Sequence, residues 1–309
     1  MTAEQRANLT AVIIPFIIFT AIWGSTWIVI RDQLGTVPPQ WSVAYRFFIA
    51  AAAMALAAKV KGHSLRLGRE ALVPILAIGV TQFCINFNSV YLAERHITSG
   101  IVATVFALLL IPNSLLGWAF LGQRPTTRFV WSSMFAIAGI GLLFWHELQQ
   151  KPAQSGAIAL GIGLTLIGML AASSANIIQA RERVRSHPLS PLLAWSMLVG
   201  ALIDSAIALA MTGPPVIEYR LGYWLGLLYL GLFASALAFS LYFPVVRRIG
   251  PAKAAYSSAI VPIIAMGFST WIEGYQWTAL TIAGALLAIG GMISALSRSR
   301  TVVASPDAA

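Results

Sequence analysis

Aromatic and hydroxyl side chains stand in the middle of an apolar run near the N-terminus. Residues 19–30 read FTAIWGSTWIVI, which places two indoles and two hydroxyls at the centre of the run. Trp23 and Trp27 are four residues apart and share one face of a helix, and Ser25 lies between them in sequence. Such a segment can turn one side toward a polar passage while its aliphatic residues meet lipid. These three side chains are the first candidates for binding a solute.

Amides, hydroxyls and tyrosines interrupt other apolar runs in the same way. A buried amide has several donors and acceptors that need partners, so two interpretations stay open for each: it lines a polar path or it joins two helices. Serines in membrane helices usually bond a nearby carbonyl, and tyrosines near the end of a span are usual at the membrane interface. The further candidate binding residues are Gln82, Asn86, Tyr91, Asn113, Ser173, Asn176, Ser235, Tyr242 and Tyr256.

Two ionisable side chains lie inside apolar runs, where charges are costly, usually paired and often functional. Arg46 lies six residues from one end of its run and Asp204 eight residues from the matching end of another. At about 1.5 Å per helical residue, their depths differ by only about 3 Å. This placement predicts an ion pair or a polar contact with a solute. The alternative is that Arg46 extends to the interface while Asp204 bonds hydroxyls.

Pro112 and Pro262 each fall near the middle of an apolar run. Proline removes a helical hydrogen bond and favours a kink. Their matched positions predict a pair of gates, and a kink that only improves packing is the simpler interpretation of either proline alone.

The composition places all these residues in a membrane. Apolar residues make up 58% of the 309-residue chain and charged residues 10%, against about 45–50% and about 25% in soluble domains. Ten apolar runs are near the roughly 20 residues that cross a bilayer, and helix is the conformation that fits them. The predicted spans are residues 11–31, 40–59, 71–93, 97–121, 128–146, 156–179, 189–212, 221–243, 251–272 and 277–297.

The basic residues follow a strict alternation between successive loops. With a cytoplasmic N-terminus, the outer segments hold only Arg31, Arg95, Lys151 and Arg220 of the 20 lysines and arginines, and the inner segments hold all the others except Arg46. This positive-inside bias predicts that both termini are cytoplasmic. The net charge of +10 follows from the same bias. Nucleic-acid binding is not expected, because the cations are spread over many short loops instead of one patch.

The chain repeats itself after about 150 residues. TSGIVATVFALLLIPNSLLGWAFLGQRPT, residues 98–126, aligns with GPAKAAYSSAIVPIIAMGFSTWIEGYQWT, residues 250–278. Pro112 then matches Pro262, and Gln123 matches Glu273. Two domains of five spans each are predicted, residues 11–146 and 156–297. Because five is odd, the second domain enters the membrane from the opposite side, which is the inverted-repeat architecture of secondary transporters.

Residues for enzymatic chemistry are missing from the sequence. Phosphate-binding loops, nucleophile elbows and paired carboxylates at mid-span are absent, and the single Cys84 offers no metal cluster. The histidines have no second ligand at zinc spacing and are expected to be solvated in or beside loops: His63, His96, His146 and His187. We therefore predict neither an enzyme nor a metal or cofactor. Without an ATP site, the energy for any transport must come from a solute gradient or ion coupling.

Several short motifs occur in a fixed order along the chain. They are WGS at residues 23–25, Pro39 with Arg46, YLAERHITSGIVA leading into Pro112, FLGQRPT at residues 120–126, and GPAKAAYSSAIVP at residues 250–262. Together they resemble the EamA family of the drug/metabolite transporter superfamily over nearly the whole chain. The chain departs from the family pattern at Gln123, where glutamate is usual, whereas Glu273 keeps the acid in the second half. If that glutamate serves proton coupling in the first repeat, the departure argues against such coupling here.

The resemblance implies an all-α integral membrane protein of ten transmembrane helices, arranged as two inverted five-helix repeats. It implies a path lined mainly by spans one, three, four, six, eight and nine, with spans five and ten at the periphery. The WGSTW segment and the aromatic content are most similar to aromatic amino-acid exporters of the YddG type.

The sequence thus predicts a multi-pass transporter of the cytoplasmic (inner) membrane that works by alternating access. The expected activity is export of small neutral or zwitterionic metabolites, amino acids including aromatic ones. Two alternatives stay open: export of drugs, cationic dyes or other metabolites, and a membrane scaffold that transports nothing. The expected partners are membrane lipid and an amino-acid substrate, and the expected state is a monomer or a weak homo-oligomer.

Overall fold

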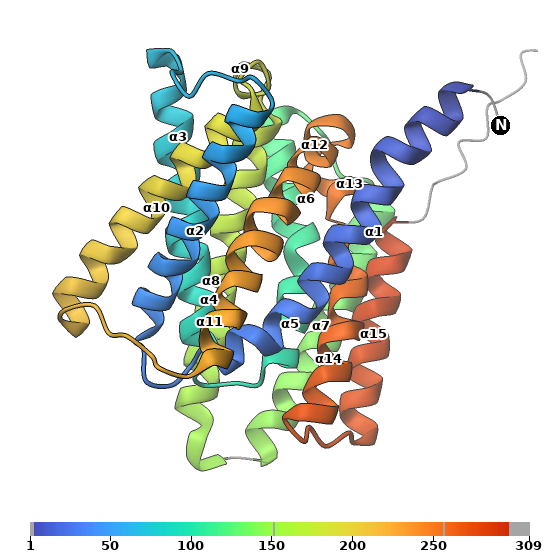
Figure 1. Ribbon diagram of the computed structural model, residues 1–309. Helices are drawn as coiled ribbons and strands as arrows, with labels where there is room; N and C mark the ends of the chain where they lie inside the picture. Colours follow the sequence, from blue (N-terminus) through green and yellow to red (C-terminus); the bar gives the residue numbers. More distant parts are fainter. Residues whose placement is uncertain (1–2, 151, 256, 297–309) are drawn as a thin grey trace, which may run out of the picture.

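Helices account for all the regular structure in the described part of the chain. The computed structural model describes residues 3–150, 152–255 and 257–296 (Figure 1). Eight helical segments in these ranges are long and apolar enough to cross a membrane, and two shorter apolar helices, Ile260–Ile272 and Ala279–Gly291, accompany them. The arrangement agrees with the ten predicted spans and gives a multi-pass membrane protein.

The first half begins with two uninterrupted helices, and its third and fourth spans are interrupted. Its elements are α1 (Ala3–Asp32), α2 (Pro39–Val60), α3 (Leu72–Ile78), a π-helical segment (Gly79–Asn86), α4 (Phe87–Ala93), α5 (Ser99–Phe106), a 3₁₀ turn (Ala107–Leu109), α6 (Leu110–Leu121) and α7 (Thr127–Gln150).

The second half repeats this pattern, including a second π-helical segment. Its elements are α8 (Ser155–Ala180), the short α9 (Glu182–Arg185), α10 (Leu189–Thr212), α11 (Leu221–Leu228), a π-helical segment (Tyr229–Leu237), α12 (Ala238–Ile249), the short α13 (Pro251–Ala254), α14 (Ser257–Ile272) and α15 (Ala279–Leu296).

The two halves interlock as inverted repeats. In Figure 1, α2 packs beside α10 at the left of the bundle, and α7 packs beside α15 at the right. The first span of one half contacts the fourth span of the other in both directions: α1 packs on α14, and α8 packs on α5 and α6. The first spans of the two halves, α1 and α8, run in opposite directions, as expected for inverted repeats.

The two π-helical segments occupy corresponding places, since they begin about 150 residues apart. Each contacts the second span of the opposite half. Gly79 lies against Val199 and the Ser196 carbonyl of α10, and Gly231 lies against Ile49 and the Arg46 carbonyl of α2, at distances that leave no room for a Cβ atom. Such π bulges are rare and frequently mark functional sites, and here they shape the third and eighth spans around the centre.

The pairing of α7 with α15 depends on backbone-to-backbone contact at small residues. A Cβ atom on Gly139 would lie 2.5 Å from the Ala288 nitrogen and 2.6 Å from the Gly284 carbonyl oxygen, whereas one on Gly141 would meet nothing within 4 Å. Small residues allow this close approach of membrane helices. The two glycines, on the same helix, form a matched pair for a stability test.

We expect Gly139→Ala to destabilise the protein by about 1–3 kcal/mol, as overpacking commonly does. Backbone atoms cannot move aside as a flexible side chain can. Gly141→Ala should be neutral or stabilising by up to about 1 kcal/mol, the gain in helix propensity. Thermal unfolding in detergent checks both values. Equal unfolding temperatures for the two variants would contradict this packing of α7 on α15.

One histidine differs from the prediction of solvated positions. His146 is buried near the end of α7, where the ring faces the Thr278 hydroxyl at 3.4 Å. The contact between α7 and the segment before α15 covers it, and this contact joins parts of the chain far apart in sequence.

Candidate functional site

A central cavity of about 100 Å³ lies between the two halves. Its wall combines α1, α2, the Gly79–Asn86 segment, α4 and α5 with α8, α12 and α14. Most of the lining side chains are less than 10% exposed, so the cavity lies deep among the helices. All six spans that the resemblance implied contribute to it, and α2 is added through Arg46.

Aromatic rings form one side of the cavity. The Trp23 ring lies 4.9 Å from the Tyr242 ring and 5.4 Å from the Phe239 ring, both edge to face. Trp23 Nε1 also donates a hydrogen bond of 3.1 Å to the Ala234 carbonyl, which ties α1 to the segment Tyr229–Leu237. The WGS motif therefore serves both the cavity and the contact between the halves.

Trp27 continues this aromatic side one helical turn further along α1. Its ring lies 5.6 Å from Phe106, and both residues line the cavity. Trp27 Nε1 is buried without a hydrogen-bond partner among the described residues, and the same is true of Asn86 Oδ1. Buried polar groups are normally paired, so the wall holds a donor and an acceptor whose hydrogen-bonding capacity is unused.

Amides from both halves contribute uncharged polar groups to the wall. Gln82 and Asn86 come from the π-helical segment and Asn176 from α8. Asn176 Nδ2 donates a hydrogen bond of 3.3 Å to Asn113 Oδ1, and Asn113 Nδ2 donates one of 3.2 Å to the Pro251 carbonyl. Asn176 thus both faces the cavity and links the halves, so the two interpretations of a buried amide apply together.

Arg46 brings a positive charge to the cavity wall. Its side chain is 1% exposed, Nε donates a hydrogen bond of 2.9 Å to Ser235 Oγ, and Cζ lies 4.3 Å from the centre of the Phe87 ring. The Tyr91 hydroxyl also interacts with the guanidinium. Hydroxyl groups and an aromatic ring therefore surround the Arg46 guanidinium at the cavity wall.

The expected ion pair between Arg46 and Asp204 is not formed. The ion pairs among the described residues are Arg31–Glu273 and Arg220–Asp32. Asp204 is fully buried between α10 and the Gly79–Asn86 segment, and its Oδ1 accepts a hydrogen bond of 2.7 Å from Asn88 Nδ2. Similar depth in the membrane does not bring two residues together, because α2 and α10 turn these side chains toward different neighbours.

Six of the predicted binding residues line the cavity: Trp23, Trp27, Gln82, Asn86, Asn176 and Tyr242. Five others lie outside its lining, and a binding role for them stays a prediction: Ser25, Tyr91, Asn113, Ser173 and Ser235. Two of them contact other residues there: Ser25 Oγ lies 2.7 Å from the Tyr229 hydroxyl, and Ser235 Oγ accepts the hydrogen bond from Arg46 Nε. Tyr256 lies outside the described residues. The spacing of residues along a helix does not show which neighbouring helix covers each face, so it could not separate the two groups.

The two prolines have different surroundings. Pro112 lies in the first turn of α6, directly after the 3₁₀ turn Ala107–Leu109, so the helix changes its winding next to it. Pro262 lies inside α14, which runs on without a break. Their matched positions in sequence do not produce matched interruptions, and a gating role for either remains a prediction.

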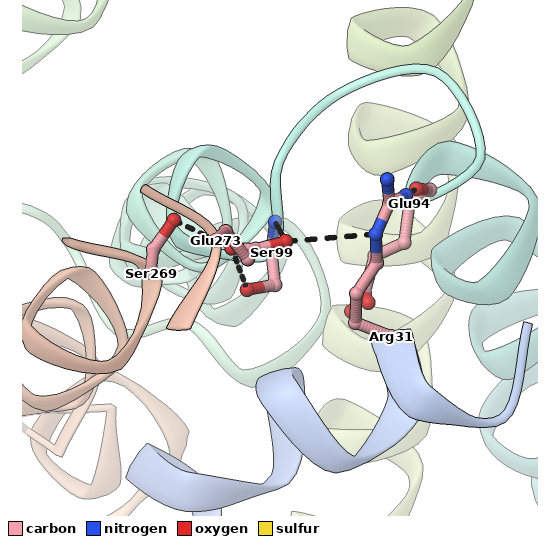
Figure 2. A network of polar contacts seen from close by, with 5 residues as sticks. All are labelled: Arg31, Glu94, Ser99, Ser269 and Glu273. Carbon is pink, nitrogen blue, oxygen red and sulfur yellow. Dashed lines mark hydrogen bonds and ion pairs between the residues drawn. The ribbon is translucent and has the colours of Figure 1, made fainter. Parts of the chain in front are cut away.

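A polar network that the sequence analysis missed closes one end of the bundle, which we call the Glu273 end (Figure 2). Glu273 Oε2 accepts hydrogen bonds from Ser99 Oγ at 2.6 Å and Ser269 Oγ at 2.5 Å, and Oε1 lies 3.6 Å from Arg31 Nε. Arg31 also donates a hydrogen bond to the main-chain carbonyl of Glu94. The alignment of Glu273 with Gln123 was the signal that could have found it.

At the opposite end of the bundle, Arg247 joins α12 to α8 and to the segment before α10. Its Nη2 donates a hydrogen bond of 2.8 Å to Gln179 Oε1 of α8, and Nη1 donates one of 3.2 Å to the His187 carbonyl. In this structure polar contacts therefore cross between elements at both ends, and the cavity lies between them.

Known proteins are similar to this chain in sequence, and one solved structure is similar to it in fold. The model of the EamA-like transporter family matches residues 10–145 and 159–297. Protein PagO of Salmonella typhimurium is 25% identical over 265 residues, covering 85% of each chain, and the uncharacterized inner membrane transporter YedA of Escherichia coli K12 is 27% identical over 270 residues, covering 84% of each chain.

A probable amino-acid metabolite efflux pump of Salmonella typhimurium is 23% identical over 288 residues, covering 89% of this chain and 91% of its own. A solved crystal structure superposes with a TM-score of 0.68 at 18% identity, covering 91% of this chain and 95% of the other, which shows a shared fold. The two family matches together span most of the sequence and coincide with the two interlocked halves. The chain therefore belongs to the EamA-like transporter family.

Proposed function

We propose that the protein is a secondary transporter that exports amino acids, aromatic ones included, across the cytoplasmic membrane by alternating access. Substrate sites of inverted-repeat transporters lie near the midplane, at the interface of the repeats. The central cavity lies in such a place, with both halves in its wall. Its volume of about 100 Å³ is below the roughly 300–1,000 Å³ of ligand pockets, so the bundle must open to admit a substrate.

The observation that carries the proposal is the charge of Arg46. A buried guanidinium at the cavity wall, without a carboxylate at ion-pair distance among the described residues, favours a ligand that supplies one. Guanidinium and carboxylate groups form strong, often bidentate hydrogen bonds. Every free amino acid carries an α-carboxylate. The same charge disfavours cationic dyes, because like charges repel strongly in a low dielectric.

The rest of the wall matches the remaining parts of an amino acid. The rings of Trp23, Phe239 and Tyr242 offer an apolar face for an aromatic side chain. The unpaired Asn86 Oδ1 is an acceptor suited to an ammonium group. The printed name of the Salmonella typhimurium relative, a probable amino-acid metabolite efflux pump, supports the same substrate class.

The orientation of the protein in the membrane is part of the proposal. The loops at the Arg247 end hold most of the basic residues, so this end faces the cytoplasm and both termini lie there. The Glu273 end then faces outward. Export starts from the Arg247 end and finishes at the Glu273 end.

A substrate panel in proteoliposomes tests the function. Vesicles loaded with labelled phenylalanine, threonine or a quaternary ammonium dye should release phenylalanine fastest and threonine more slowly, with dye release no faster than from protein-free vesicles. The expected order follows from the aromatic wall and the Arg46 charge. Release of the dye alone would replace the proposal by drug export, and release of none would favour a scaffold.

A further inference from the structure

Glu94 is the most unusual titratable residue outside the cavity lining. It is fully buried, one residue beyond the span Arg69–Ala93, and both of its carboxyl oxygens lack a hydrogen-bond partner among the described residues. Glu273 nearby is different, since it accepts three hydrogen bonds and contacts Arg31. One carboxyl of the network is therefore equipped to carry a negative charge and the other is not.

The charged and titratable groups around Glu94 come from four elements. Arg31 belongs to α1, Arg46 to α2, Tyr91 to α4, and Glu273 follows α14. In Figure 2, Arg31 lies between Glu94 and Glu273. Arg31 contacts both residues: its guanidinium lies beside the side chain of Glu273 and donates to the main-chain carbonyl of Glu94.

The environment favours the protonated form of Glu94. Burial raises the pKa of Glu94 well above the usual value, the negative charge of Glu273 raises it further, and Arg31 and Arg46 lower it in part. An ionised carboxylate in this position would be buried without hydrogen bonds, which is costly. The closed arrangement is therefore compatible with a neutral Glu94 and an ionised Glu273.

We propose that Glu94 is a proton-binding site, and that the proton bound there holds the Glu273 end of the bundle closed. When the proton leaves, Glu94 repels Glu273 and competes with it for Arg31. The contact that joins α1 to the end of α14 then weakens, and the two halves separate at this end. Because opening hydrates Glu94 and lowers its proton affinity, the closed state is favoured at low pH and lost as pH rises.

Distance measurements on the full-length protein in lipid nanodiscs test the opening directly. Spin labels at Gly35 and Gln276, both exposed, report the separation of the segments that follow α1 and α14. The single cysteine, Cys84, is first replaced by alanine. We expect the distance to lengthen along a single titration curve as pH rises, whereas Glu94→Gln should keep the short distance at every pH.

Glu218→Gln is the matched control. Glu218 lies at the same end of the bundle, is partly exposed, and its carboxylate accepts hydrogen bonds from the Tyr219 and Arg220 main-chain N–H groups, apart from the Glu273 network. This variant should titrate like the parent. If the Glu94→Gln variant opens with the parent's midpoint, or if Glu218→Gln abolishes the response, the proposal is wrong.

Infrared difference spectroscopy gives a second readout that does not depend on labels. A protonated carboxyl band should disappear at the midpoint of the distance change in the parent and in Glu218→Gln, and should be absent from the spectrum of Glu94→Gln. Persistence of the band in Glu94→Gln would assign it to another residue and overturn the proposal. Should Glu94→Gln fail to fold, Glu94→Met supplies an uncharged side chain of similar length. Neither readout requires transport, so the result stands apart from the proposed substrate.

Discussion

Replacing Arg46 by glutamine is expected to lower kcat/KM for phenylalanine at least about 100-fold. A buried charge left without its partner costs about 3–5 kcal/mol, and each 1.4 kcal/mol is a factor of ten. In the variant, the substrate carboxylate would face Phe87 without a cation. Counterflow of labelled phenylalanine in proteoliposomes measures the loss.

Comparing substrates makes this prediction specific to the carboxylate. Phenylalanine amide has the same ring but no carboxylate, so the parent should strongly prefer the acid and the variant should not. Arg46→Lys keeps the charge but not the bidentate geometry and should retain part of the preference. Arg95→Gln, which removes an exposed arginine, is the control and should transport normally. An unchanged preference in Arg46→Gln would remove Arg46 from the binding site.

Replacing Trp23 by alanine is expected to reduce phenylalanine transport about 10- to 100-fold and threonine transport much less. The change removes the ring that meets Tyr242 and Phe239, and each aromatic pair is worth about 0.5–1.5 kcal/mol beyond burial. It also removes the hydrogen bond to the Ala234 carbonyl. Initial rates for the two amino acids in the same vesicles give the ratio.

Two companion variants separate binding from folding. Trp23→Phe keeps an aromatic ring but not the indole donor, so it should recover most of the selectivity if the ring is what matters. Trp131→Ala removes an indole that is 60% exposed on α7, away from the cavity, and should leave the ratio unchanged. A variant of Trp23 that folds and transports both amino acids at the parent's ratio would show that the aromatic wall does not select substrate.

The architecture was accessible from the sequence because the bilayer permits few solutions. A run of about 20 apolar residues has to be a helix in hydrocarbon, since its backbone must satisfy its own hydrogen bonds. The internal match of residues 98–126 with residues 250–278, together with an odd number of spans in each half, then predicts inverted repeats. These arguments depend on composition and order along the chain, which the sequence contains in full.

The identity of cavity-lining residues was only partly accessible. Trp23, Trp27, Gln82 and Asn86 line the cavity, whereas Ser25 contacts Tyr229. Residue type shows that a side chain needs a partner, without showing which partner is within reach.

The sequence by itself determined the membrane class, the helices and the repetition, because these follow from local composition and periodicity. The tertiary structure alone decided that Asp204 meets Asn88 and not Arg46, and that Arg31 and Glu273 come together beside Glu94. Both outcomes depend on the rotation of each helix about its axis and on the π-helical segments that alter that rotation. Those rotations are set by packing among helices from both halves, such as the glycine contacts of Gly79 and Gly231, which no single span encodes.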